Sequence, residues 1–334
     1  MKRRSLWFTG PRAVETRESA IPAPSEGQVL VQTRASAVST GTELLIYRNQ
    51  FPAGMQADDT LAALRRPLGY PMQYGYACLG RITRRGNGIP REWQDRRVFA
   101  FNPHESHFLA RTEDLFTVPD SMTDEEALFL PSMETAVNFI LDGQPMIGES
   151  VAVLGQGVVG LMTTALLSLF PLERLVTSDL YPLRRSHSIE TGAQHCFDPL
   201  AAKDQPDRLT RDFDLVFELS GDPTALDQAI AMTGFGGRVI IGSWYGARRA
   251  SLDLGGTFHR GRIRIAGSQV STIASGLQER WSRRRRFAVA ANLLTRVQPA
   301  RFVTHRFTLE QAGEAFAALD ERPQDCLQVI FLYD

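Results

Sequence analysis

The chain has 334 residues, with 37 basic and 37 acidic side chains and 43% hydrophobic residues. This length suits two domains of ordinary size, each with enough apolar residues for a core. The balanced charge gives no electrostatic reason to expect broad binding to nucleic acid or to an anionic membrane. Cys78, Cys196 and Cys326 lie far apart and form no CxxC pair, which excludes a disulfide framework and a cysteine-rich structural zinc site.

The N-terminus carries no signal-peptide pattern. Lys2, Arg3 and Arg4 are followed by an apolar stretch that ends at once, at Phe8. The most apolar long segment, 154–170, is interrupted by glycine and hydroxyl residues, so it indicates a buried turn and helix rather than a membrane span. We expect a soluble cytoplasmic protein with neither a membrane nor a nucleic acid as its partner.

The first third of the chain is rich in strand patterns. Alternating or apolar runs at 28–35, 79–85 and 97–101 predict strands, and the polar segment 55–67 predicts a loop or short helix. The pattern changes near Pro119. From there, Thr123 and Glu126 have the spacing of a helix N-terminal capping box.

The middle of the chain alternates apolar strands with helical patterns. The predicted strands are 150–155, 175–179, 213–218 and 237–242. This alternation is typical of βαβ units in a doubly wound parallel sheet, so the predicted fold class is α/β.

Towards the C-terminus a helix is predicted over 277–294, with Arg283–Arg286 on its outer turn. A solvated helix face is favoured over a nucleic-acid patch, because one short run is not a basic surface. Thr308 is expected to cap a helix that continues to Leu319, and 327–332 to form a last strand.

A glycine motif gives the first indication of chemistry. Gly155, Gln156, Gly157, Val158, Val159 and Gly160 form a GxGxxG that follows an apolar strand and opens an apolar helix. The first glycine turns the chain, the second admits a pyrophosphate, and the third lets the helix approach the sheet. The free N–H groups of the helix N-terminus favour the phosphates.

Asp179 ends the next strand and is predicted to accept hydrogen bonds from the adenine ribose. Its charge would repel a 2′-phosphate, so NAD is favoured and NADP remains possible. Arg184 and Arg185 follow closely. They either reach a phosphate or form a surface pair on the next helix, and the sequence leaves both alternatives open.

Together these segments resemble the medium-chain dehydrogenase/reductase superfamily, which contains zinc alcohol dehydrogenases and zinc-free quinone reductases. The resemblance runs nearly end to end and is carried by segments 28–35, 37–43, 75–80, the glycine motif, 239–243, 262–268 and 307–316. It implies a β-rich GroES-like catalytic domain over 1–122 and a Rossmann dinucleotide-binding domain over 123–270. The C-terminal segment, 271–334, is then expected to return to the catalytic domain.

The chain departs from the zinc-binding members of that family at all three catalytic ligand positions. Thr40 and Tyr76 stand where a cysteine and a histidine are expected, and the third region reads Leu130, Pro131, Ser132. Catalytic zinc needs three nitrogen, sulfur or carboxylate ligands, so we expect no metal. His104 and His107 form an HxxH without a third ligand. They are read as polar residues at the substrate mouth or as surface histidines.

Without zinc, other groups must polarise the carbonyl and move a proton. By the resemblance, Thr42 matches a hydroxyl that relays protons, and Tyr76 would donate its phenol to the substrate oxygen. Glu43 would orient Thr42, act as an acid or base, or bond nearby backbone as a structural carboxylate. Glu134, an unpaired acid in an apolar stretch, is expected near the nicotinamide with a raised pKa.

The resemblance also implies which residues surround the nicotinamide and how two copies of the chain associate. The residues expected around that end of the cofactor are Thr135, Gly242, Ser243 and Ser268, and Ser220 is expected to end another strand on the cofactor side of the sheet. The edge strand near 262–267 is expected to pair across a two-fold axis into a homodimer.

The predicted function is zinc-independent hydride transfer between nicotinamide and a small-molecule alcohol, carbonyl or conjugated enone. A biosynthetic cyclic-alcohol dehydrogenase of tetrapyrrole or secondary-metabolite type, and a non-catalytic redox sensor, remain alternatives.

Overall fold

Two stretches that lie far apart in the sequence, up to Pro131 and from Gln298 to Asp334, form one unit of the computed structural model, and Ser132–Val297 form the other. The structure describes residues 2–58 and 60–334. These units differ from the expected boundaries at two places. Residues 123–131 group with the first unit, and 271–297 group with the second.

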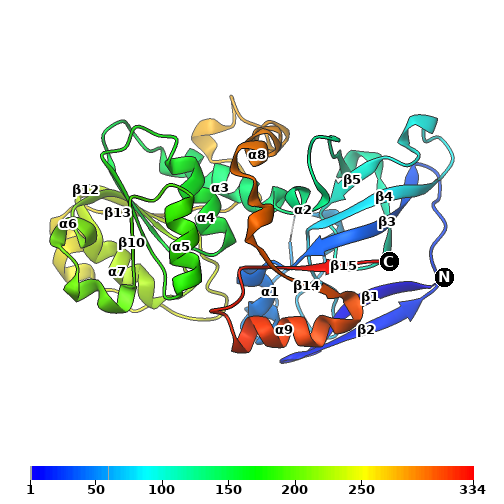
Figure 1. The fold of residues 1–334 in the computed structure, drawn as a ribbon, viewed down its shortest axis with the longest axis horizontal. Coiled ribbons are helices and arrows are strands. Elements are labelled where there is room, and N and C mark those ends of the chain that lie inside the picture. Colours follow the sequence, from blue (N-terminus) through cyan, green and yellow to red (C-terminus); the bar gives the residue numbers. More distant parts are fainter. Residues whose placement is uncertain (1, 59) are drawn as a thin grey trace. The chain divides into compact units, whose positions relative to one another are not determined.

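The first unit is built on a seven-stranded sheet and a separate antiparallel hairpin (Figure 1). The order along the sheet is β14-β15-β3-β4-β5-β7, with β6 paired to the first half of β3. Its strands are β3 (Gln28–Ala37), β4 (Cys78–Arg85), β5 (Arg97–Ala100), β6 (His107–Arg111), β7 (Leu115–Thr117), β14 (Val303–Thr308) and β15 (Gln328–Leu332). The hairpin is β1 (Arg3–Gly10) with β2 (Ala13–Ser19).

Alternation along the strands builds the core of this sheet. Val29 and Val31 on β3 pack with Cys78 and Ile82 on β4 and with Val98 on β5, all without exposed surface. Every second side chain of a strand faces the same side, so this spacing buries one face.

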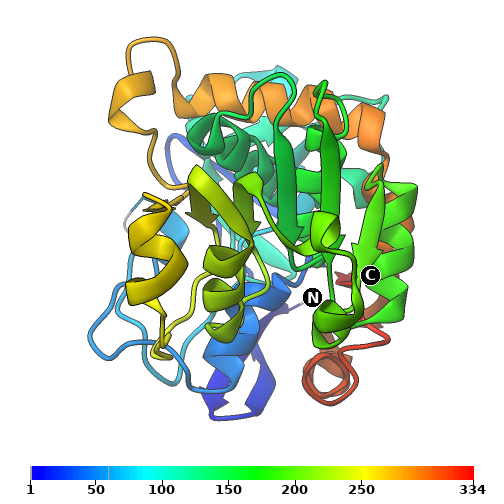
Figure 2. The same cartoon turned by 90° about the vertical axis from the view of Figure 1, so that its left-hand side faces the viewer.

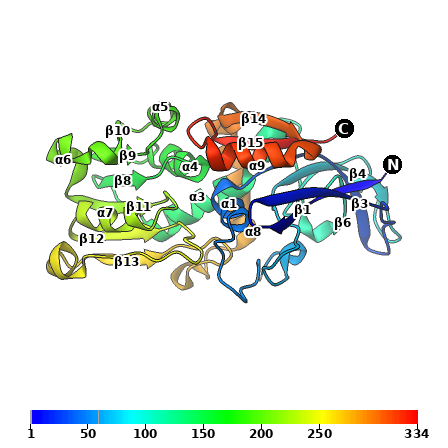
Figure 3. The same ribbon diagram turned by 90° about the horizontal axis from the view of Figure 1, so that it is seen from below.

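The C-terminal segment completes the first unit. Strand β15 pairs with the end of β3, and helix α9 (Ala312–Glu321) contacts both β2 and helix α1 (Thr40–Tyr47) (Figures 1 and 3). A short helix, α2 (Asp124–Ala127), follows the last strand of the N-terminal part. Within the expected loop 55–67 there is one short 3-10 turn, Ala62–Leu64, and Asp59 lies outside the described residues.

The second unit is a six-stranded parallel sheet with the order β10-β9-β8-β11-β12-β13 (Figures 2 and 3). Its strands are β8 (Ser150–Leu154), β9 (Arg174–Ser178), β10 (His195–Phe197), β11 (Phe213–Glu218), β12 (Thr233–Ile241) and β13 (Arg264–Gly267). Its helices are α3 (Leu130–Gly143), α4 (Val158–Leu167), α5 (Pro182–Glu190), α6 (Asp207–Thr210), α7 (Thr224–Met232) and α8 (Arg283–Val297). This is the doubly wound order in which a ligand crevice opens between the first and fourth strands, here β8 and β11.

Both faces of this sheet are covered. Val151 and Val153 of β8 pack against Phe139 of α3, whereas Ala152 and Leu154 belong to the cluster that contains Leu226 of α7. A strand covered on both faces needs apolar side chains on both sides, which explains the unbroken apolar run 151–154 within the strand predicted at 150–155. The expected α/β fold class is confirmed. No helix in the described part of the chain is long and apolar enough to cross a membrane.

Candidate active site

The glycine motif forms a tight turn between β8 and α4. Gly155 has a φ of +92°, and a Cβ there would lie 2.4 Å from Cα of Ser220, on the neighbouring strand end. Gly160 sits so close to the turn that a Cβ would lie 2.0 Å from the Gly155 carbonyl oxygen. At Gly157, the N-cap of α4, a Cβ would meet no described atom within 4 Å. The turn therefore leaves open space at the one glycine predicted to admit a pyrophosphate.

The carboxylate of Asp179 is hydrogen-bonded to the backbone of this turn. Its Oδ2 accepts the backbone N–H of Gln156 at 2.7 Å, and its Oδ1 accepts that of Tyr181 at 2.9 Å. Asp179 follows β9 directly, so it lies at the carboxyl edge of the sheet. The Gln156 side chain points inward, because its carbonyl oxygen accepts the hydroxyl of Thr164 on α4.

The two arginines after Asp179 have different roles. Nη1 of Arg184 lies 4.0 Å from Asp179 Oδ2, and its guanidinium packs 4.8 Å from the centre of the Tyr181 ring. Arg185 donates instead to the carbonyl oxygens of Asp179 and Leu180. Only Arg184 is thus placed beside the carboxylate predicted to bind the ribose.

A buried carboxylate that the sequence analysis did not identify accepts hydrogen bonds from residues that follow β11 and β12. Glu218, the last residue of β11, has no exposed surface, and its Oε1 accepts the N–H of Ser220 at 2.8 Å. Ser243 accepts the N–H of Gly221 and follows Gly242 at the end of β12. The Tyr245 hydroxyl donates to Glu218, and burial together with that charge raises the pKa of the phenol. An acid at the end of an apolar strand was the available signal.

Arg286 is fully buried, which corrects the prediction that the whole arginine run is a solvated face. Its Nε and Nη2 lie 3.1 and 2.9 Å from Oε1 of Glu134. Its Nη1 donates to Asn138 at 2.6 Å and to the carbonyl of Thr272 at 3.0 Å. The other arginines of the run, 283–285, are exposed.

Glu134 is therefore paired, not unpaired as expected. Burial raises the pKa of its carboxyl group, and the charge and hydrogen bonds of Arg286 oppose that shift. Thr135, the next residue, is half-buried. The network continues through Asn138, whose side-chain amide donates to Ser268 Oγ at 3.0 Å. Ser268 is the first residue after β13. Ser268 thus belongs to a polar network of the second unit.

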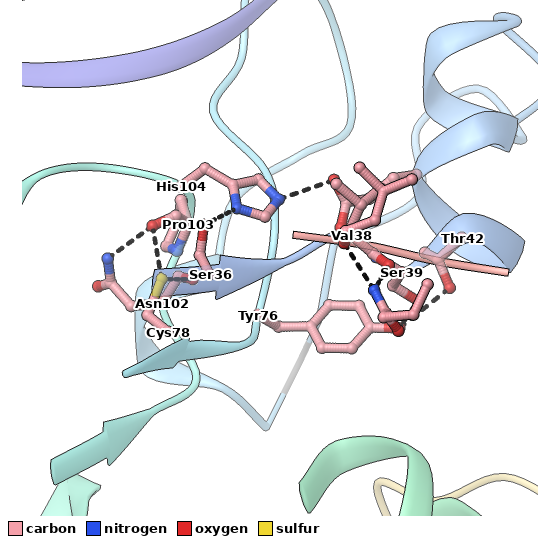
Figure 4. A network of polar contacts seen from close by, with 12 residues as sticks. Ser36, Val38, Ser39, Thr42, Tyr76, Cys78, Asn102, Pro103 and His104 are labelled. Carbon is pink, nitrogen blue, oxygen red and sulfur yellow. Dashed lines mark hydrogen bonds and ion pairs between the residues drawn. The ribbon is translucent and has the colours of Figure 1, made fainter. Parts of the chain in front are cut away.

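In the first unit, hydroxyl groups gather at the start of α1 (Figure 4). The Tyr76 phenol forms a hydrogen bond with Ser39, the N-cap of α1, and lies 3.4 Å from Thr42 Oγ1. The structure thus brings Thr42 and Tyr76 together, two residues predicted to act on the substrate. Burial raises the pKa of the Tyr76 phenol, and the hydrogen bonds from Ser39 and Thr42 oppose this.

Glu43, in the first turn of α1, has no exposed surface. Its Oε1 accepts the backbone N–H of Ser39 at 2.7 Å, and its Oε2 lies 3.0 Å from Nε2 of His104. Of its three predicted roles, the contacts match that of a structural carboxylate. His104 is fully buried and His107 is 8% exposed, so neither is the surface or mouth histidine expected.

Two of the positions that the resemblance assigns to zinc ligands, Thr40 and Tyr76, carry hydroxyl groups. The Tyr76 oxygen is bonded to Ser39, and Thr40 Oγ1 is buried without a hydrogen-bond partner among the described residues. Across residues 2–58 and 60–334, no group of three His, Cys, Asp or Glu side chains is arranged to hold a metal ion. This donor set does not fit catalytic zinc, which takes three nitrogen, sulfur or carboxylate ligands.

Comparison with known proteins gives a family match over part of the chain. Residues 158–288 match the family described as zinc-binding dehydrogenase. The match covers 131 of the 334 residues, so it reports a similarity of that part of the chain to the family. The matched residues all lie in the second unit and exclude positions 40 and 76, so the match does not report on the ligand positions.

One similar protein is matched by sequence and two by fold. The chain is 25% identical to the 2-desacetyl-2-hydroxyethyl bacteriochlorophyllide A dehydrogenase of Cereibacter sphaeroides, over 99% of this chain and 98% of that protein. The Escherichia coli CFT073 alcohol dehydrogenase rspB, solved with NADH, has a TM-score of 0.78 at 17% identity, covering 99% of both chains. A protein of Sinorhizobium meliloti 1021, solved bound to NADP, has a TM-score of 0.76 at 18% identity, covering all of both chains.

Proposed function

We propose that this protein is a zinc-independent NAD(P)-dependent oxidoreductase that acts on an alcohol, a carbonyl or a conjugated enone. The observation that carries the proposal is the glycine turn at the β8–β11 switch point of the sheet, with open space at Gly157. Backbone N–H groups at a helix N-terminus favour a pyrophosphate at that place. Relatives of the same fold bind NADH and NADP, which supports a dinucleotide here.

We favour NAD over NADP. Asp179 would accept hydrogen bonds from the ribose hydroxyls, and its negative charge opposes a 2′-phosphate. Arg184, beside that carboxylate, is the residue that would accommodate the 2′-phosphate if Asp179 turned away. The balance between these two side chains then sets the cofactor preference.

The hydroxyl cluster of Ser39, Thr42 and Tyr76 takes the place of a metal in this proposal. The nicotinamide supplies the hydride chemistry when it is bound. Tyr76 donates a hydrogen bond to the substrate oxygen and gives it a proton during reduction, and Thr42 and Ser39 hold the phenol in place. A phenol with a raised pKa keeps its proton at neutral pH, so it enters the reaction as a donor.

Within the alternative of a biosynthetic cyclic-alcohol dehydrogenase, we favour the tetrapyrrole type, because a dehydrogenase named for a hydroxyethyl bacteriochlorophyllide aligns with 99% of this chain. The non-catalytic redox sensor remains the alternative from another functional class. For association we propose a homodimer through β13, which is an edge strand of the six-stranded sheet.

The test is an assay of purified protein with NAD and NADP against alcohols, and with NADH and NADPH against aldehydes, ketones and enones. We expect turnover that survives dialysis against a chelator and does not increase when zinc is added. Activity that disappears on chelation and returns with zinc would contradict zinc independence. Nucleotide binding without turnover of any substrate class would favour the redox sensor.

A further inference from the structure

His104 is held on several sides within the first unit (Figure 4). Its Nε2 lies 3.0 Å from Glu43 Oε2 and its Nδ1 lies 2.7 Å from Ser36 Oγ. The imidazole and the ring of Phe331 pack in a T-shaped arrangement, with 5.2 Å between the ring centres. Because both nitrogens and one side of the ring have partners, the imidazole is confined to a single orientation.

The first link from His104 to the hydroxyl cluster runs through Glu43. The 3.0 Å contact between Nε2 of His104 and Oε2 of Glu43 is a hydrogen bond between two side chains without exposed surface. The other carboxylate oxygen accepts the N–H of Ser39, whose hydroxyl bonds the Tyr76 phenol. Glu43 thus transmits the position of the imidazole to the N-cap of α1.

The second link runs through the backbone before Tyr76. Gly75 has a φ of +117°, and a Cβ there would lie 2.6 Å from Cδ2 of His104 and 2.7 Å from Nε2. The backbone N–H of His104 also donates to the carbonyl of Tyr74 at 3.3 Å. The imidazole therefore packs directly against the chain that carries Tyr76, at the one residue type that leaves room for it.

We propose that His104 is a positioning residue that sets the distance between Tyr76 and the hydroxyls of Ser39 and Thr42. It contacts the segments that carry these hydroxyls, at Glu43 and at Gly75, and acts through them on the phenol. The inference rests on the proposed function only in that the cluster is taken as the reactive site. The arrangement of the cluster can be measured without turnover.

The matched variants are His104→Gln and His107→Gln. His107 is also buried, lies in the same segment and bonds a hydroxyl, Ser106 Oγ, at 3.0 Å, but its partner lies outside the cluster. Protein labelled with 3-fluorotyrosine gives one fluorine resonance for each tyrosine, and Tyr76→Phe identifies the resonance of Tyr76. We expect His104→Gln to displace that resonance and His107→Gln to leave it in place.

Kinetics supply the second measurement. In the assay that gives turnover, His104→Gln should lower kcat by about 10- to 100-fold, as expected for a misplaced reactive group, while KM for the nucleotide stays unchanged. His107→Gln should leave both constants unchanged. If the unmodified protein turns over no substrate, the proposed function fails, and the fluorine measurement still decides the positioning.

An unmoved Tyr76 resonance in His104→Gln, or an equal displacement in both variants, would overturn the inference. If His104→Gln does not fold, Ser36→Ala replaces it, because this change removes the partner of Nδ1 and leaves the imidazole itself in place; it also removes a hydrogen bond to the Tyr333 hydroxyl, whose fluorine resonance is separate from that of Tyr76. We then expect a smaller displacement of the Tyr76 resonance, and none at all would overturn the inference.

Discussion

The guanidinium of Arg286 and the carboxylate of Glu134 form an ion pair, with 2.9 Å between Nη2 and Oε1, and the arginine has no exposed surface. The pair joins α8 to α3 within the second unit. The same guanidinium donates to Asn138 and to the carbonyl of Thr272, so one side chain ties two helices to the segment after β13.

Removing the arginine should destabilise the second unit strongly. Arg286→Ala leaves Glu134 buried without its cationic partner, and loss of one member of a buried pair costs about 3–5 kcal/mol. Arg284→Ala, an exposed change in the same helix, should stay within about 0.5 kcal/mol of the unmodified protein. Urea unfolding measures both, and similar losses in the two variants would contradict a special role for Arg286.

Two glycines of the motif should respond differently to alanine. Gly160→Ala places a Cβ against the Gly155 carbonyl and should lower the unfolding temperature. Gly157→Ala meets open space in the free protein, so its unfolding temperature should not change, yet NAD binding should weaken by about tenfold or more, equivalent to about 1.4 kcal/mol. Thermal unfolding and nucleotide titration separate the two effects. Unchanged NAD affinity in Gly157→Ala would argue against a pyrophosphate there.

The cofactor preference should depend on Asp179 and Arg184. Asp179→Asn removes the charge that opposes a 2′-phosphate, so the affinity for NADP should rise relative to NAD. Arg184→Ala should shift the ratio the other way, and Arg185→Ala, which alters only contacts to backbone carbonyls and Asp198, serves as the control. Titration with both nucleotides gives the ratios. A protein that already prefers NADP would contradict the assignment of Asp179.

The Tyr76 phenol should be required for turnover. Tyr76→Phe removes the proton donor and should lower kcat by about 10²- to 10⁴-fold, the usual contribution of general acid catalysis. Tyr74→Phe is the matched control, because its buried ring packs edge-on against Tyr76 with 6.2 Å between ring centres. Equal rates for Tyr76→Phe and the unmodified protein would move the donor role elsewhere.

Stability should depend on pH through Glu105. Burial raises the pKa of its carboxyl above the usual 4.5, and the hydrogen bond from Asn102 opposes this. The folded protein therefore binds this proton more tightly than the unfolded chain does. The resulting stabilisation is present below the unfolded pKa and is lost as pH rises through the folded pKa.

Glu105→Gln should accordingly gain stability relative to the unmodified protein as pH rises from about 4 to about 7. Urea unfolding across that range measures the difference, with the exposed Glu113→Gln as the control. A difference that does not vary with pH would show that Glu105 has the same pKa in the folded and unfolded protein.

The sequence by itself determined the features that depend on neighbouring residues. Thr123 and Glu126 form the predicted capping box, and Thr308 forms another with Gln311. The glycine motif makes its turn because the backbone of Gly160 lies against the carbonyl of Gly155, where a side chain would not fit. Such interactions join residues close in the chain, so residue type and spacing are enough to predict them.

Only the tertiary structure decided which polar residues are buried. Nothing in the run 283–286 distinguishes Arg286 from its neighbours in the sequence. Arg286 is buried because it lies on the face of α8 that contacts Glu134. His104 is likewise enclosed by Ser36, Glu43 and Phe331, which come from three separate parts of the chain. A charged or polar group is buried where distant residues supply its partners, and a single sequence does not show which distant residues will meet.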